Sequence, residues 1–523
     1  MLSRLRSANM TLIRRLGPLA VVAVLIVSGA SVWAQPPSTK TKSSGSGKGA
    51  APAKGAASAK AGSVKSAQPE PKSRATAPDV EAKSEPAPNT GPSAKYLPSE
   101  VFRDPNALKL LDVTRFPESR ARPVVPAEVE ALKAMAADAN VTLDPNLIDR
   151  VVEAEAARLT NHANILALID PPVNTNPNSP TVHAINDATK TLLEPIFAAR
   201  SIKNINFLRR YDKALITKLQ PLLKNHLIPR IQAMIILGQS ASSDDLPIYL
   251  AELKNATQTV WVKLWALEGL SNLIDTGGRP SAAVQIEAAK AVADFLERDE
   301  DLPWPAQYRA LQALAAMRQG FVPSSPKQAH MASSAMRLLS DGDAKPEVRA
   351  EAARALGMMQ ITTAVPRYNY PLVAHAVGEL AATIGAQISA TYGTNPLKAR
   401  YLTALLAGPV YESFDGAPGA RESGLIHETT GEPAAYAEKV FELVKAVIKG
   451  SADLLVSASR QIPTRLKDLD ARVEALKSHL QKNPPPDRRL VQGGPEYPST
   501  MGGQAALPAA HAAPVAGATA ARR

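Results

Sequence analysis

The stretch Pro346-Glu-Val-Arg-Ala-Glu-Ala-Ala-Arg-Ala-Leu-Gly357 decides the fold. Ala352 lies three positions after Arg349, Leu356 lies seven positions after it, and Gly357 follows directly. On a helix, a small residue at the third position lets a neighbouring helix approach closely, and the leucine fills the space beside it. A small residue at the end then allows the helix to end tightly.

The same spacing recurs upstream, which indicates a repeat. The copies are Arg230, Ala233, Leu237 and Gly238; Lys263, Ala266, Leu270 and Ser271; and, more weakly, Ala310, Ala313 and Met317. Their starting positions are separated by 33, 47 and 39 residues, as in two-helix repeats with loop insertions. Asp144-Pro145 predicts a further helix start, with the aspartate as N-cap. Because no stretch alternates apolar and polar residues, we predict an all-α fold.

This pattern resembles the HEAT-repeat family, and its bacterial lyase-like branch in particular, over about residues 200–390. The resemblance implies an α-solenoid of paired antiparallel helices with a concave binding surface, and it implies no substrate. It also implies that Arg230 and Arg349 pair with aspartates in a ladder between repeats. Lys263 departs from the pattern because lysine cannot make the bidentate contact. A generic helical bundle is the alternative, since Ala- and Leu-rich helices often have these spacings.

Composition and charge exclude several classes of function. The chain has no cysteine, so disulfides, thiolate zinc sites and cysteine nucleophiles are excluded. The net charge of +12 lies in the ends, while residues 96–481 carry a net charge of −1. A nucleic-acid-binding domain more often has a basic stripe on its fold, so we expect no nucleic-acid partner.

Residues 1–34 are typical of a secretory signal peptide. Arg14-Arg15 precede an apolar run, and small residues lead to a cleavage site between Ala34 and Gln35. We therefore expect an exported protein, periplasmic or extracellular. The alternative is an uncleaved membrane anchor over residues 16–34.

The remaining chain divides by composition. Residues 35–95 form a basic linker of Ala, Ser, Pro, Gly and Lys without aromatic residues, which favours disorder. This linker is either a spacer or a contact to anionic lipid or wall polymer. We expect a helical array over 96–407, a loop over 408–432, helices over 433–482 and a disordered tail over 483–523.

An a/d heptad pattern covers the last predicted helix. Its apolar positions step by four and three: Ile462, Leu466, Leu469, Val473, Leu476 and Leu480. One interpretation is a homodimer through a short coiled coil over residues 462–480. The other is an amphipathic helix that packs back onto the helix at 433–457, because so few heptads rarely suffice alone.

No catalytic constellation is recognisable, so we expect neither an enzyme nor a cofactor or metal. His427-Glu428 is half of a zinc-protease motif and lacks the second histidine. Two i, i+4 aromatic pairs form either core packing or a recognition patch: Trp261, Trp265, Trp304 and Tyr308. An enzyme with a dispersed site stays the least favoured alternative.

These features favour an exported, non-enzymatic protein–protein interaction scaffold that binds another protein of the cell envelope. The alternative is a structural envelope component whose basic linker contacts anionic lipid or polymer. A salt-sensitive association that needs residues 35–95 would distinguish the second from the first.

Overall fold

The computed structural model describes residues 109–169, 180–275, 280–298, 302–325, 328–361, 365, 367–417 and 423–501. The predicted signal or anchor, its cleavage site at Ala34-Gln35 and the linker over 35–95 lie outside these residues. No described helix combines the length and hydropathy that a membrane span needs.

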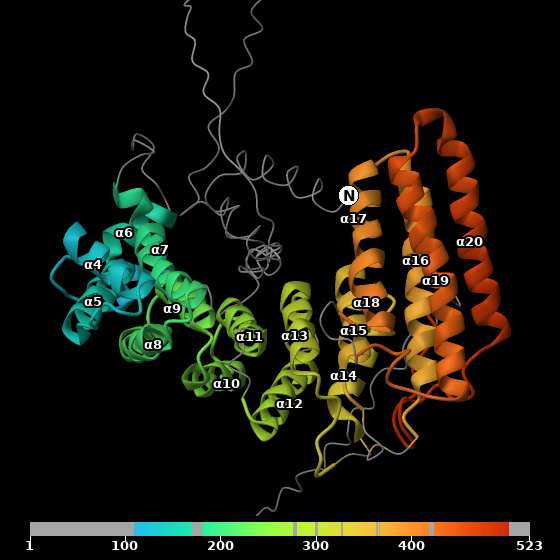
Figure 1. The fold of residues 1–523 in the computed structure, drawn as a ribbon, viewed down its shortest axis with the longest axis horizontal. Coiled ribbons are helices and arrows are strands. Elements are labelled where there is room, and N and C mark those ends of the chain that lie inside the picture. Colours follow the sequence, from blue (N-terminus) through green and yellow to red (C-terminus); the bar gives the residue numbers. More distant parts are fainter. Residues whose placement is uncertain are drawn as a thin grey trace, which may run out of the picture.

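The protein has an all-α fold. Helices make up the regular structure of the described residues, and only isolated β-bridges occur among them, such as Gln319 with Gln360. At the amino-terminal end, a cluster of helices surrounds the long α7 (Figure 1). Its bounds are α4 Pro126–Ala137, α5 Pro145–Thr160, α6 His162–Ile169, α7 Pro180–Ser201 and α8 Ile205–Leu219.

Two layers of alternating helices form the middle of the chain (Figure 1). In one layer, each helix packs against the next: α9 Leu227–Ser240, α11 Val260–Asp275, α13 Trp304–Met317 and α15 Pro346–Met358. The other layer consists of α10 Leu246–Lys254, α12 Ala282–Arg298 and α14 His330–Leu339. Each of these helices also packs on the helix that follows it in the chain.

The repeated spacing marks the buried faces of the first layer. Ala233, Ala266 and Ala352 are fully buried, as the predicted close approach requires. A Cβ atom on Gly269 of α11 would lie 3.0 Å from the Cα atom of Gly238 in α9, so these backbones touch. The alanines and glycines therefore set the distance between successive helices.

A bundle of longer helices closes the carboxyl-terminal end (Figure 1). It contains α16 Tyr370–Tyr392, α17 Pro396–Leu405, α19 Glu432–Val456 and α20 Ile462–Lys482, with α16, α19 and α20 in mutual contact. The helices α16 and α17, which precede residue 407, pack with the helices at 433–482. Helices α14, α15, α19 and α20 cover α16. Most of the surface of α16 is apolar, as this burial requires.

The heptad face of α20 packs inside this bundle. A Cβ atom on Gly378 of α16 would lie 3.1 Å from Leu480, and one on Gly385 would lie 2.7 Å from Val473. Leu469 and Leu476 are fully buried in the same interface. The surface predicted for a homodimer over 462–480 is thus occupied within the chain, as the alternative interpretation expected.

Two expectations of irregular structure were wrong. Within the predicted loop over 408–432, the chain continues α17 through a π-helical turn, Leu406–Val410, into α18, Tyr411–Asp415. The π turn accommodates Pro409, which lacks an N–H group for a regular helix. Residues 483–501, predicted as part of a disordered tail, form an ordered segment, here called the C-terminal strap. Its apolar anchors are buried: Leu490, Val491 and Tyr497.

Candidate functional site

Burial divides the predicted aromatic patch into two pairs. Trp261 and Trp265 on α11 are each 8% exposed and belong to the core. Trp304 and Tyr308 on α13 are half-buried and pack only partly against that core. The core interpretation therefore applies to α11, while the α13 pair leaves part of each ring at the surface.

Two large side chains of α17 are also exposed. Leu397 is 76% exposed and Tyr401 is 41% exposed, and their i, i+4 spacing places them side by side. Burial and the nearby carboxylate of Glu347 raise the pKa of Tyr401, and Tyr308 adds to this shift. We call these exposed and half-buried side chains, Trp304, Tyr308, Leu397 and Tyr401, the α13–α17 face.

Ion pairs join α11 to α13 and α15 to α18. Glu268 of α11 and Arg309 of α13 approach to 2.5 Å, and both side chains are buried. Arg354 of α15 contacts Glu351 at 2.7 Å and Glu412 of α18 at 2.7 Å. Links between neighbouring helices therefore exist, but they use glutamates at positions that the sequence did not single out.

The expected arginine–aspartate ladder is wrong for both arginines. Arg230 donates to the carbonyl oxygen of Asn225 and, over 3.2 Å, to the side-chain oxygen of Gln258. Arg349 donates over 3.0 Å each to the Leu339 carbonyl oxygen and to Oγ1 of Thr500. Within the described ranges, no ion pair joins either guanidinium to an aspartate, and Gln258 and Thr500 are their side-chain partners.

A buried carboxylate holds the C-terminal strap on α16. Glu379 is 1% exposed and accepts hydrogen bonds from the Ser499 hydroxyl, from the Thr500 N–H at 2.9 Å and from the Thr500 hydroxyl at 3.1 Å. His375 Nε2 lies 3.2 Å from the same carboxylate. Burial alone would raise the pKa of Glu379, but the hydrogen bonds from His375, Ser499 and Thr500 outweigh burial and lower it.

The network continues from His375 to the other side of the bundle. His375 Nδ1 lies 2.8 Å from the Tyr436 hydroxyl, which donates to the Asn483 carbonyl oxygen at 2.8 Å. The Ser499 hydroxyl donates to a carboxylate and not to an imidazole, so the cluster does not have the geometry of an activated nucleophile. Along this network, hydrogen-bond donors meet acceptors, as expected for a structural clamp between the strap and α16.

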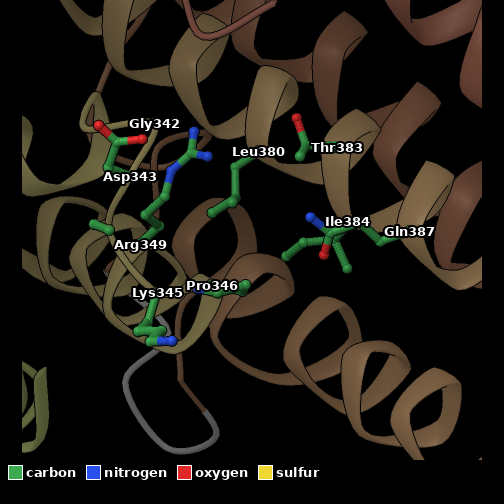
Figure 2. A pocket seen from close by; sticks show the side chains of 10 residues that line it. Gly342, Asp343, Lys345, Pro346, Arg349, Leu380, Thr383, Ile384 and Gln387 are labelled. Carbon is green, nitrogen blue, oxygen red and sulfur yellow. The ribbon is translucent and has the colours of Figure 1, made fainter. Parts of the chain in front are cut away.

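A cavity of about 190 Å³ lies beside this clamp (Figure 2). The loop before α15 and one face of α16 line it. Figure 2 shows Arg349 on one side and Leu380, Thr383 and Ile384 on the other. Arg349 is 4% exposed, so the cavity meets a guanidinium that is otherwise enclosed by protein.

A second buried acidic group lies between α8 and α10. Asp212 and Asp245 are 6% and 0% exposed, and burial raises the pKa of each carboxyl group. Ser240 and Arg200 lie beside them, with the Ser240 hydroxyl donating to Asp245. Because these carboxyl groups are enclosed, they do not meet a substrate that arrives from solvent.

Among the described residues, no three histidine or acidic side chains are arranged to hold a metal ion. No family model matches the chain, and no curated protein or solved structure is significantly similar to it. Functional conclusions therefore depend on the packing and the surfaces of the chain itself.

Proposed function

We propose that this chain is a non-enzymatic scaffold that binds another protein through the α13–α17 face. Alternating helices in two layers and the repeated small residues support the further proposal that the middle of the chain is a HEAT-like α-solenoid. Such an array displays one edge of each repeat along an extended surface, which suits protein binding rather than chemistry.

Exposure on the α13–α17 face carries this proposal. Leu397 and Tyr401 of α17 are exposed, Trp304 and Tyr308 of α13 are half-buried, and α15 contacts both of these helices. Aromatic side chains concentrate at the energetic centres of protein interfaces, and grouped exposed apolar side chains mark interaction sites. The Arg354–Glu412 ion pair joins this α15 helix to α18.

The partner is proposed to be a protein of the cell envelope. This part of the proposal depends on the sequence of the first 34 residues, which is typical of export. On this view the basic segment 35–95 acts as a tether, and the binding surface belongs to the helical array.

An in-cell crosslinking pull-down with surface variants tests the proposal. We compare the unaltered protein with the double variant Leu397→Asp, Tyr401→Ala and with the control Ile205→Asp. Ile205 is 55% exposed at the start of α8, so the control changes an apolar surface residue in the amino-terminal helix cluster, outside α13 and α17. We expect one dominant partner with the unaltered protein and the control, and at least about tenfold less with the double variant.

Two results would contradict the proposal. Equal recovery with the double variant would show that the α13–α17 face is not the binding site. Recovery that is lost only when residues 35–95 are deleted, and that is sensitive to salt, would support a structural envelope component with a binding linker.

A further inference from the structure

The cavity beside the strap contains unused hydrogen-bond donors. A guanidinium has five N–H donors, and Arg349 uses Nε for Leu339 and Nη2 for Thr500. Its Nη1 atom has no protein acceptor among the described residues. Gln387, at the rim, likewise has a side-chain amide without a protein partner in the described part of the chain.

Unused donors and shape at the cavity favour a small monoanion. Lys345 and Arg349 are the cations of the lining and Asp343 is its acid, while the carboxylates of Asp341 and Glu379 also interact with Arg349. Leu380 and Ile384 form an apolar wall opposite the arginine. The wall offers no donors to the many oxygens of a phosphate, and the Asp343 carboxylate repels a second negative charge. A carboxylate matches the planar edge of a guanidinium, and an attached aliphatic group matches the wall.

The size of the cavity limits the ligand. A cavity of about 150 Å³ holds a benzene molecule. The cavity here, at about 190 Å³, therefore accepts a group of roughly six to eight non-hydrogen atoms. A branched short-chain acid or the terminal residue of a polypeptide has this size.

We propose that the Arg349 cavity binds an aliphatic carboxylate, with Arg349 and the Gln387 amide on its oxygens and Leu380 and Ile384 against its alkyl group. This site is separate from the α13–α17 face, and its existence does not depend on the proposed scaffold function. The carboxylate belongs either to a free short-chain acid or to the carboxyl terminus of a polypeptide.

Ligand titration of the full chain tests this assignment. The probes are isovalerate and N-acetyl-L-valine, whose acetyl group stands for the preceding residue of a polypeptide and would lie outside the cavity. Each probe is compared with its uncharged amide by ligand-observed NMR and calorimetry. We expect each acid to bind at least about tenfold more tightly than its amide, because only the acid forms charge-assisted hydrogen bonds. Tighter binding of N-acetyl-L-valine than of isovalerate would identify a polypeptide terminus, and the reverse order would identify a free acid. Equal binding of acid and amide, or no binding of either acid at about 10 mM, would overturn the proposal.

Two variants locate the bound acid. Arg349→Lys keeps a positive charge but loses the planar pair of donors, and Gln387→Trp fills the mouth of the cavity from a half-buried position. Arg337→Lys is the matched control, because this arginine of α14 donates to the Leu296 carbonyl oxygen outside the cavity. We expect either cavity variant to reduce acid binding to the level of the amide, while the control does not. If Arg349→Lys does not fold, the Gln387→Trp variant by itself tests the assignment. Unchanged acid binding in that variant would contradict the assignment.

Discussion

Replacing Glu268 by glutamine tests how the helices α11 and α13 are joined. Glu268 and Arg309 lie 2.5 Å apart, with side chains that are 6% and 3% exposed. The variant Glu268→Gln removes the carboxylate charge that is paired with the buried Arg309 guanidinium. Removing one member of a buried ion pair costs about 3–5 kcal/mol of unfolding free energy, so we expect a loss of that size.

The pair itself is expected to add little net stability. Burial raises the pKa of Glu268, and Arg309 only partly offsets this. An acid with a raised pKa in the folded state stabilises the fold at low pH, and this contribution is lost as the pH rises from the unfolded to the folded pKa. The double variant Glu268→Leu, Arg309→Met should therefore be as stable as the unaltered protein, or up to about 4 kcal/mol more stable.

Thermal and urea unfolding at pH 7 compare the two variants. In a domain of roughly 150–250 residues, 1 kcal/mol shifts the Tm by about 2–4 °C, so the single variant should unfold roughly 6–20 °C lower. The urea m-value shows whether both variants unfold as the same cooperative unit. The reasoning is refuted if the single variant loses less than about 1 kcal/mol, or if the double variant is as unstable as the single one.

Further predictions concern a glycine, an acid and the strap. Gly357→Ala should destabilise the fold by about 3 kcal/mol or more in urea unfolding, because its Cβ would lie 2.0 Å from the Ser413 carbonyl oxygen, while Gly393→Ala, in open space, should not. Burial raises the pKa of Glu428 to about 7, so stability should fall as pH rises from about 4.5 to 7. Glu428→Gln should flatten that fall in a series of melts, and an unchanged slope would contradict the assignment. Deleting 487–501 should lower the Tm at pH 7, because a buried carboxylate then loses its strap donors; an unchanged Tm would show that the strap is not a clamp.

Local signals in the sequence predicted the helical core well. The alanines and leucines at the third and seventh repeat positions are buried as expected, including Ala352 and Leu356. Asp144 caps α5 by accepting from the N–H groups of Asn146 and Leu147. These features succeed because helix periodicity and capping depend on neighbours within one or two turns.

Such local signals could not predict contacts between segments that are distant in the sequence. The strap has a composition typical of disorder, yet Leu490, Val491 and Tyr497 find apolar surface, and Glu379 supplies an acceptor more than a hundred residues away. Gly357 was expected to end a helix, whereas it also makes room for α18. No spacing rule relates such positions, because only the folded chain brings them together.

The surface candidates show the same limit. The i, i+4 spacing in the sequence placed two aromatic pairs in one group. Tertiary packing buries Trp261 and Trp265 and leaves Trp304 and Tyr308 half-buried. Leu397 and Tyr401 were not singled out, because their i, i+4 spacing on a helix is equally typical of a core face. Exposure, which decides between core and recognition, is a property of the assembled helices.

Site-specific photocrosslinking in the producing cells tests the scaffold proposal most directly. A photoreactive side chain is placed at position 401 on the α13–α17 face, and in a second sample at position 290, a half-exposed lysine of α12 in the other layer. We predict one dominant protein adduct from position 401 that is absent from position 290 and is lost on Leu397→Asp. Identical adducts from both positions, or none from position 401 while the protein is folded, would contradict a binding face on α13 and α17.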